Sequence, residues 1–302
     1  MGSTLTKGSL FPIELAEEMF NMVRGKSSLA RLSGASPIPF NGERVFTFNF
    51  DKEVDLVAEN GAKSNGGATI TPVNITPVKI EYGMRVSDEF MYASDAARIQ
   101  YLKAFAEGFA SKAARALDIM AFHGVNPRTG ETASSISSLS FDSVVSNMVT
   151  YDSSAPQDNV VSAIALVEAA EHEVTGLAMA PTFKSALAQL KKGSSSYEPM
   201  FPELGWGSTV GAINGLPADS NSTVSFGGNA DKAIVGNFRD FFRWGFAKEI
   251  PLKVIEYGNP DNDAEAGDLQ GHNQVYLRAE AYLGWGILAP GAFSIVKSGA
   301  SA

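Results

Sequence analysis

The sequence predicts an α+β fold in which a projecting β-hairpin and one long helix precede a mixed second half. Residues 43–57 and 68–86 alternate like β-strands, and residues 95–122 repeat apolar side chains every three or four positions. In the second half, short apolar runs are separated by glycine and proline. The chain has 302 residues, of which 44% are hydrophobic and 19% charged, so it can bury a sizeable core.

Composition excludes several classes of function. Cysteine is absent, so we expect no disulfide, no thiolate nucleophile and no zinc–thiolate site. The net charge of −9 argues against tight binding of nucleic acid, which depends on lysine and arginine, but it is compatible with a container that contacts DNA weakly. The sequence shows no secretory signal and no apolar run of about 18 residues, so we expect neither export nor a membrane span.

Residues 1–40 predict an N-terminal arm. An amphipathic helix is expected over 12–25, because Pro12 suits a first helical turn and Gly25 suits a helix end. Gly34, Pro37 and Pro39 then interrupt the chain. The apolar positions of the helix are Ile13, Leu15, Ala16, Met19, Phe20 and Val23.

Residues 41–84 predict an extended loop in the form of a β-hairpin. The first strand alternates over 45–50 and is expected to continue through Val54, Leu56 and Val57. The return strand contains Pro72 and Pro77, which lack an amide proton and confine it to an edge or a bulge. The tip, residues 59–68, holds turn-forming residues and one lysine: Asn60, Gly61, Lys63, Asn65, Gly66 and Gly67.

This hairpin has no apolar core of its own, and a two-stranded ribbon is marginally stable in water. It must therefore lie on another surface. We expect the tip to contact a neighbouring subunit, because a long hairpin is suited to reaching over a partner that covers its edges. The alternative is a hairpin that folds back on its own domain.

Residues 85–135 predict a region dominated by one long helix. Ser94 or Asp95 can cap its start, and Gly124 stops it after Phe122. At 1.5 Å per residue the helix would measure about 40 Å, so it needs a sheet or a neighbour alongside. Its apolar stripe consists of Ile99, Leu102, Phe105, Ala106, Phe109, Ala113, Leu117 and Met120.

Residues 136–250 predict a mixed region, and residues 251–302 predict the closing strands. A short buried strand, LAMAP, leads to a helix that starts at Pro181, and strand-like alternation follows from Lys248. A further amphipathic helix is expected over 158–173, with its buried stripe on Val161, Ile164, Ala165, Val167, Glu168 and Ala169.

The sequence does not bring together the residues that catalysis or metal binding requires. His123, His172 and His272 each lack neighbours of the kinds that such sites use. His172 opens a zinc-protease helix pattern, but Gly176 stands where the second histidine is required. We therefore expect no catalytic residue, no cofactor, no metal site and no enzymatic activity.

Two further features have ordinary structural interpretations. Asp261, Asp263, Glu265 and Asp268 faintly resemble a calcium loop, but the glycine comes one place late and the final glutamate is missing. We expect a solvated loop there. The three tryptophans, at 206, 244 and 285, are interpreted as packing residues rather than ligand platforms.

Several segments, taken in order, resemble parts of one known family. RVSDEFMYAS before the long helix and ALDIMAFHGVNPRTG at its end are similar to a spine helix and the turn after it. LAMAPTFKSALAQLK, GLPADSN and DKAIVGNFRDFFRWGF resemble an axial domain, and QVYLRAEAYLGWGILAPGAFSIV resembles the final peripheral-domain strands. Together they resemble the major capsid proteins of tailed bacteriophages with the Hong Kong 97-type fold, over residues 40–297.

The resemblance implies an N-terminal arm (1–40), an extended loop (41–84), a peripheral domain with the spine helix (85–135), an axial domain (136–250) and return strands that complete the peripheral domain (251–302). It implies a head protein that assembles itself as pentamers and hexamers into an icosahedral shell around double-stranded DNA, in the bacterial host cytoplasm. The implied partners are further copies of the chain, a portal protein, a scaffolding protein, a decoration protein and weakly contacted DNA. An encapsulin-like shell that holds a cargo enzyme is the alternative.

Two features occur in only some members of this family: an N-terminal scaffolding segment and a covalent crosslink between neighbours. Some members begin with a long scaffolding segment, whereas only 40 residues precede this hairpin, so we expect a separate scaffolding protein. Some members crosslink neighbours through a loop lysine and a distant asparagine. Lys63 lies in the corresponding loop, but no partner asparagine can be matched, and we do not expect a crosslink.

Overall fold

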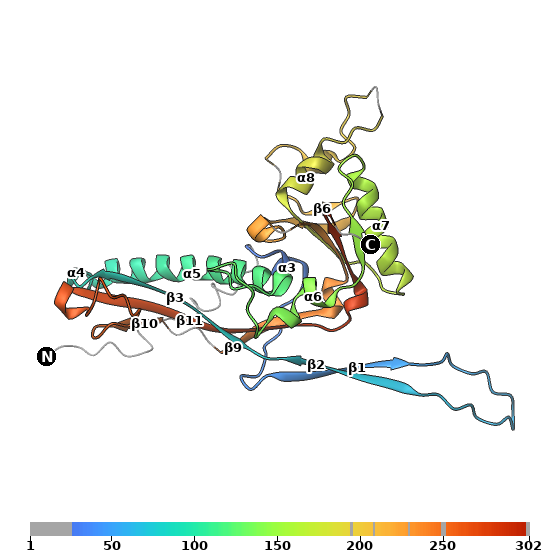
Figure 1. The fold of residues 1–302 in the computed structure, drawn as a ribbon, viewed down its shortest axis with the longest axis horizontal. Helices are drawn as coiled ribbons and strands as arrows, with labels where there is room; N and C mark the ends of the chain where they lie inside the picture. The colour runs from blue at the N-terminus through green and yellow to red at the C-terminus, as the bar shows by residue number, and fades with distance from the viewer. Residues whose placement is uncertain (1–25, 194–195, 208, 229, 249–251, 300–302) are drawn as a thin grey trace.

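The structure, a computed structural model, describes residues 26–299 apart from 194–195, 208, 229 and 249–251. Figure 1 shows three parts that extend in different directions: a long helix beside a long sheet, a second domain to one side, and a projecting hairpin. The predicted α+β class is confirmed. The helix expected over 12–25 lies outside the described residues.

The longest strand, β11 (Gln274–Ile287), organises the first sheet. It pairs antiparallel with β3 (Val78–Ser87) along one edge. Along the other edge it pairs with β10 (Leu252–Ile255) and then β9 (Phe242–Lys248). One face of β11 is buried through alternate residues, Leu277, Ala279, Ala281 and Leu283, as the pleat of a half-covered sheet requires.

Helix α5 (Asp95–His123) covers this sheet, and the two layers form the first domain (Figure 1). Both predicted ends are confirmed: the Ser94 hydroxyl accepts a backbone N–H, and Gly124 adopts the left-handed conformation, with φ 64°. The predicted stripe is correct from Leu102 to Met120, where the named residues are buried. It is wrong at Ile99, which is 58% exposed because the helix extends there beyond the close packing of the core.

Strands β1 (Glu43–Phe50) and β2 (Ala68–Ile75) form the hairpin, in register from Glu43 opposite Ile75 to Phe50 opposite Ala68. Among the described residues β2 pairs only with β1, so Pro72 lies in an edge strand, as predicted. Val54, Leu56 and Val57 were predicted as strand, and this was wrong. They lie in the loop 51–67, because β2 begins too late to offer them partners.

The second domain is built on a six-stranded sheet in the order β4, β12, β8, β5, β7, β6. Helices α7 (Pro156–Ala169) and α8 (Pro181–Ala188) pack against it. Its strands are β4 (Met148–Thr150), β12 (Phe293–Lys297), β8 (Asp231–Gly236), β5 (Gly176–Met179), β7 (Leu216–Ser220) and β6 (Ala212–Ile213).

The closing segment divides between the two sheets, which differs from the expectation that residues 251–302 complete the peripheral domain. A turn at Pro290–Ala292 redirects the chain after β11. Strand β12 then pairs with β8 and β4 in the second sheet. The apolar pattern of β12 shows that the strand is buried, but it does not select between two apolar sheets.

Strand β5 and helix α8 are confirmed where the sequence predicts them. Helix α7 was predicted four residues too long at its end, since Glu171 adopts a left-handed φ of 60° after it. Its buried face was only partly predicted: Val167 is buried as expected, but Val161 is exposed, and the buried residues Asn159 and Ala163 were not in the predicted stripe. Within the described ranges, no helix has the length and apolar character needed to cross a bilayer.

The segment 26–38 passes between the two domains. It contains helix α3 (Ser28–Leu32), and the amide of Ser36 then donates to the carbonyl oxygen of Trp244 at 2.8 Å. A Cβ on Gly245 would lie 1.8 Å from the carbonyl oxygen of Ser36, so only glycine permits this approach. The described residues also contain three single-turn helices: α4 (Glu89–Tyr92), α6 (Phe141–Val144) and α9 (Phe238–Phe241).

The interpretation of the tryptophans as packing residues is correct for two of three. Trp244 and Trp285 are buried in the core. Trp206 is 105% exposed, because it stands in a loop between Gly205 and Gly207 and outside both sheets.

We expect Leu102→Asp to abolish folding, because it places an unpaired carboxylate at a site that is 3% exposed. Such a change costs about 4–5 kcal/mol or more, a large part of the stability of a domain. Ala104→Asp, on the exposed side of the same helix, is the control and should stay folded. Circular dichroism and soluble yield measure the outcome, and equal solubility of both variants would show that the buried face is misassigned.

Candidate functional site

The six residues predicted as the hairpin tip lie together in the loop 51–67, and all are exposed. Asn60 supplies a left-handed turn, with φ 65°, and the amide of Gly61 donates to the Ala58 carbonyl at 2.8 Å. At the base of the loop the amide of Gly67 donates to Asp51 Oδ1 at 2.7 Å. The loop is thus anchored at its base by polar contacts, and Lys63 lies on its exposed surface.

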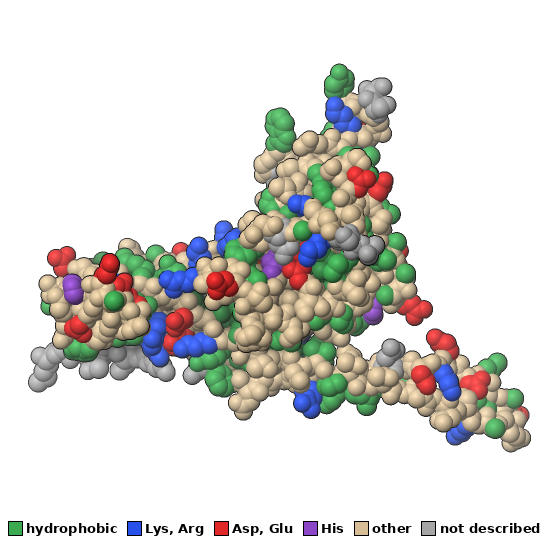
Figure 2. Space-filling model, in the orientation of Figure 1, with side chains coloured by type: hydrophobic (Ala, Val, Ile, Leu, Met, Phe, Trp, Pro, Cys, Tyr) green, Lys and Arg blue, Asp and Glu red, His purple; other side chains and the backbone are tan. Residues whose placement is uncertain are grey.

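One face of the hairpin is aromatic and exposed. Phe46, Phe48 and Phe50 alternate along β1 and are 53%, 62% and 75% exposed. The residues opposite Phe46 and Phe48 in β2 are Pro72 and Ile70, so the apolar face spans both strands. Figure 2 shows hydrophobic side chains along this projecting part of the surface. An exposed apolar face of this kind is a candidate contact surface for a partner.

Asp118 joins the two domains to the segment that precedes the hairpin. It lies on α5 and is fully buried. Its carboxylate accepts hydrogen bonds from the Ser27 hydroxyl, from the amides of Ser28 (2.9 Å) and Leu29 (3.2 Å), and from the Thr223 hydroxyl (2.8 Å). Burial raises the pKa of Asp118 to about 6, although these hydrogen bonds oppose the shift.

A second carboxylate continues this contact. Asp219, on β7, accepts a hydrogen bond from the Ser28 hydroxyl at 2.5 Å and an ion pair from Arg31 at 2.6 Å. Asp118 and Asp219 therefore hold the two sides of α3. The short helix is fixed between the spine of the first domain and the sheet of the second.

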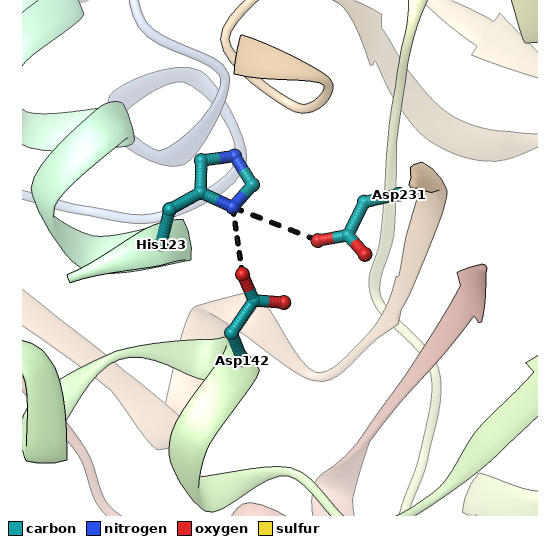
Figure 3. A group of neighbouring side chains, drawn as sticks. All are labelled: His123, Asp142 and Asp231. Carbon is teal, nitrogen blue, oxygen red and sulfur yellow. Dashed lines mark hydrogen bonds and ion pairs between the residues drawn. The ribbon is translucent and has the colours of Figure 1, made fainter. Parts of the chain in front are cut away.

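His123, the last residue of α5, lies in a cluster of ionisable groups (Figure 3). Its Nδ1 is 2.9 Å from Asp142 Oδ2 and 3.6 Å from Asp231 Oδ2, and its Nε2 is 2.9 Å from the Thr223 carbonyl oxygen. Lys297 Nζ lies 3.2 Å from Asp142 and 3.1 Å from Asp231. The expectation that no histidine has such neighbours was therefore wrong for His123.

The cluster carries strongly shifted pKa values. Burial has the largest single effect on His123 and would lower its pKa, but the hydrogen bonds to Asp142 and Thr223 and the charges of Asp142 and Asp231 together outweigh it and raise the pKa. Burial, together with the charge of Asp142, raises the pKa of Asp231 to about 7. Burial disfavours the charged form of Asp142, but the hydrogen bonds to His123 and Asp231 prevail and lower its pKa.

The three side chains drawn in Figure 3 also have the composition and spacing of a metal site. Lys297 argues against that interpretation. Its ammonium group contacts both carboxylates and supplies the positive charge that a cation would supply. We therefore interpret the cluster as an ionic junction among α5, α6, β8 and β12.

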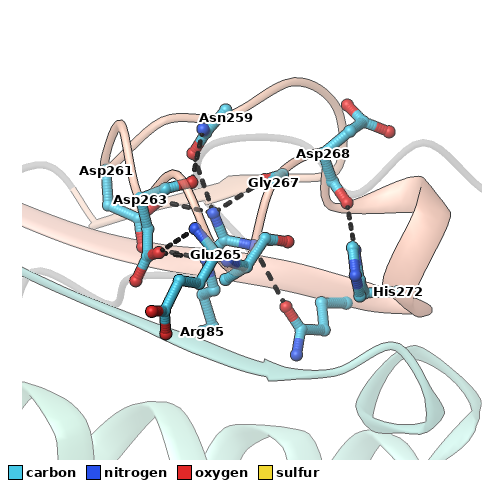
Figure 4. Close-up of polar contacts among 10 residues, drawn as sticks. Arg85, Asn259, Asp261, Asp263, Glu265, Gly267, Asp268 and His272 are labelled. Atoms are coloured by element: carbon cyan, nitrogen blue, oxygen red, sulfur yellow. Dashed lines mark hydrogen bonds and ion pairs between the residues drawn. The ribbon is translucent and has the colours of Figure 1, made fainter.

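The acidic loop near residue 261 is organised around Arg85 (Figure 4). The guanidinium donates to both carboxylate oxygens of Asp261 at 2.6 and 2.8 Å, and to Asn259 Oδ1 at 2.8 Å. It also reaches the carbonyl oxygens of Ala266 and Gly267 and the Gln274 side chain. The hydrogen bond to Arg85 lowers the pKa of Asp261 to about 2. The four acidic residues are exposed to solvent, as expected, and Arg85 also holds the loop in place.

The other two histidines do not form comparable groups. The ring of His172 packs edge-on against Phe241, with 4.9 Å between ring centroids. Nδ1 of His272 lies 3.0 Å from the carbonyl oxygen of Asp268. Both contacts are those of ordinary structural histidines.

The sequence matches the phage capsid family over residues 7–298. The structure is similar to a protein of Mycobacterium phage Ogopogo, with 31% identity over 90% of this chain and 92% of that chain, and a TM-score of 0.75. It is also similar to a protein of Gordonia phage Cozz, with 24% identity over 91% and 87% of the two chains and a TM-score of 0.73. No curated protein matches the sequence.

A more distant likeness concerns the fold alone. The capsid of an empty GTA particle, determined with C5 symmetry, shares 15% identity over 91% of this chain and 90% of that chain, with a TM-score of 0.63. Together with the long helix, the projecting hairpin and the second domain, these matches define a shell subunit of the Hong Kong 97-type fold. The chain belongs to the phage capsid family and is a major capsid protein. The encapsulin-like alternative is not favoured.

The aromatic face of the hairpin was accessible to sequence reasoning through the alternation of Phe46, Phe48 and Phe50. The ionic junction was not, because Asp142, Asp231 and Lys297 come from three distant segments that meet only in the folded chain. A partial signal existed, since aspartate and lysine at the ends of apolar strands are uncommon in buried positions.

We expect Asp118→Asn to destabilise the protein by about 3 kcal/mol, because all four partners of Asp118 are donors and the new amide would face them with N–H groups. Urea denaturation at pH 7.5 measures the change. Asp55→Asn, in the exposed hairpin loop, is the control and should change stability by less than about 0.5 kcal/mol. Equal effects of the two substitutions would contradict the role of Asp118 in joining the segments.

Proposed function

We propose that copies of this chain assemble as pentamers and hexamers into an icosahedral shell that encloses double-stranded DNA. The observation that carries the proposal is the aromatic face of the hairpin, formed by Phe46, Phe48 and Phe50. It projects away from both domains (Figure 1) and has no cover within the described part of the chain. A neighbouring copy that covers it would stabilise the hairpin and the shell together.

Exposed apolar side chains lie at three extremities of the molecule, and this distribution supports contacts with neighbouring copies at each of them. The side chains that are more than four-fifths exposed fall in the hairpin loop, in α4 at the far end of the first domain, and in two loops of the second domain: Val54, Leu56, Tyr92, Tyr197 and Trp206. Closed rings use heterologous contacts, in which different surfaces of one subunit meet. Exposed apolar groups at opposite ends suit such contacts.

The hairpin tip is the proposed contact with a neighbouring copy. Asn60, Gly61, Lys63, Asn65, Gly66 and Gly67 are exposed and positioned at the extremity of the hairpin. We assign the second domain as the axial domain and the first as the peripheral domain, with β12 placed in the axial domain and β9 in the peripheral domain. The capsid particle determined with C5 symmetry offers a precedent for fivefold rings.

The family resemblance suggests further protein partners, and the net charge of the chain suggests how it contacts DNA. We propose a separate scaffolding protein, a portal protein and a decoration protein, with assembly in the bacterial host cytoplasm. Packaged DNA would be contacted weakly, because the chain carries a net charge of −9. The function is structural and needs no catalytic group.

Deletion of residues 60–68 should leave a folded subunit but prevent stable shells, because the loss of one contact is repeated over every copy. Negative-stain electron microscopy of the protein, expressed with its neighbouring genes, measures the outcome beside the unaltered chain. Closed shells from the unaltered chain are expected, and a dispersed monomer under every condition would overturn the proposed function. Normal shells from the deletion would refute only the role of the tip.

A matched pair tests the aromatic face itself. Phe48→Ser removes an exposed ring, whereas Thr47→Ser changes the adjacent residue on the opposite face of β1. We expect the first substitution to reduce the yield of shells at least about tenfold, which corresponds to about 1.4 kcal/mol per contact. The second should have no effect. Similar yields would exclude the aromatic face as a contact.

The fluorescence of Trp206 should report assembly directly. Trp244 and Trp285 are buried already, whereas Trp206 is exposed at the rim of a groove of about 630 Å³. We expect the tryptophan emission to shift to the blue when subunits assemble, since a neighbouring copy would cover the indole. Trp206→Phe is the control and should show no shift. An unchanged wild-type spectrum on assembly would place Trp206 outside the subunit contacts.

A further inference from the structure

The end of α5 contacts the second domain at Thr223, a residue that is fully buried. The hydroxyl of Thr223 donates to Asp118 at 2.8 Å, and its carbonyl oxygen lies 2.9 Å from His123 Nε2. Two ionisable side chains at the end of one helix therefore hold the same residue of the other domain. Any change in their protonation acts on this joint.

The geometry at His123 favours protons on both ring nitrogens. Nε2 faces a carbonyl oxygen, which can only accept, so it carries a hydrogen. Nδ1 faces Asp142 Oδ2 at 2.9 Å and Asp231 Oδ2 at 3.6 Å. Asp142 is the more acidic of these carboxyl groups and stays ionised, so the hydrogen in the 2.9 Å contact belongs to Nδ1. Both ring nitrogens thus face acceptors, and this arrangement favours the imidazolium over either neutral tautomer.

The charges around His123 come from every element packed at the junction. Asp142 lies on α6, Asp231 begins β8, and Lys297 ends β12. Asp118 acts on the same joint from α5, through Thr223. Lys297 alone cannot balance Asp142 and Asp231. A proton on His123, or on Asp231, must supply the remaining positive charge, and its loss leaves two buried carboxylates against one ammonium group.

We propose that this cluster is a proton-operated lock between α5 and the second domain, closed in mild acid and loosened as the pH rises above neutrality. The proton would be released to solvent, and no covalent bond changes. Loosening would free the second domain to change its angle to the spine helix, and so change the shape that the subunit offers to its neighbours. Only this consequence rests on the proposed shell function.

The direction of the pH effect follows from the linkage between proton binding and folding. The pKa of His123 is raised above its ordinary value of 6.5 and that of Asp231 is raised to about 7, so both groups bind protons more tightly in the folded protein than in the unfolded chain. Their stabilisation is present at low pH, below the unfolded values. It is lost as the pH rises through the folded values, from about neutral upward. Loss of the proton from either group acts in the same direction.

Hydrogen exchange of the dispersed full-length subunit tests the lock without requiring assembly. Peptides that cover 116–124 and 220–226 would be followed by mass spectrometry at pH 5.5 and 8.5, after correction for the intrinsic exchange rate. We expect protection there to fall about tenfold at the higher pH, the effect of one pKa unit of coupling. Peptides from β3 and β11, which lie outside the junction, should change little.

Three variants decide the mechanism. Asp231→Asn imitates the protonated carboxyl and removes one buried charge, so the fall in protection between the two pH values should shrink to the part that His123 contributes. His123→Gln retains a donor toward Thr223 but no charge, so protection at pH 5.5 should fall below that of the unaltered chain, and the remaining pH response should be that of Asp231. His272→Gln, on an exposed loop, should behave as the unaltered chain. Equal protection of the unaltered junction at the two pH values, or an undiminished pH response in both His123→Gln and Asp231→Asn, would overturn the lock. If His123→Gln fails to fold, Asp231→Asn decides.

Discussion

The packing of α5 against the sheet of β3, β11 and β10 is the contact on which the rest of the molecule depends. The first domain is elongated because α5 and the sheet are both long. The hairpin and the second domain are each connected to an end of one of these elements. Strand β3 begins directly after β2 and so directs the hairpin. The C-terminal end of α5 carries Asp118 and His123, which hold the second domain. Apolar burial thus stabilises the first domain, and buried polar groups fix the orientation of the second domain relative to it.

The exposed surfaces follow from this division. A compact monomer would cover the phenylalanines of β1, but a hairpin that projects from a two-layer domain cannot do so within its own chain. The same holds for Trp206 at the rim of its groove. Each contact need not be strong, because closed symmetric assemblies repeat it many times. The subunit therefore has buried cores of its own, but it leaves apolar side chains on its surface that a neighbouring copy can cover.

The local features could be predicted from the sequence because their causes are local. Periodicity predicted α5 with its serine cap and its glycine end, and alternation predicted β1, whereas the exposure of its phenylalanines was found in the structure. Contacts between distant segments could not be predicted in this way. The apolar run of β12 fits either sheet, and the pairing with β8 is decided by where the turn at Pro290–Ala292 points. The partners of His123 were missed for the same reason, since no local pattern connects Asp142 with Asp231.

The loop bound to Arg85 has a consequence for how the far end of the first domain keeps its shape. Loops with several carboxylates and carbonyl oxygens commonly recruit a dissociable divalent ion, and their order then varies with the supply of that ion. Here the cation is covalently part of the chain, and it cannot be removed by a chelator or by dilution. A particle built from such subunits would carry this end of each subunit unchanged from the ion-rich interior of a cell into dilute surroundings.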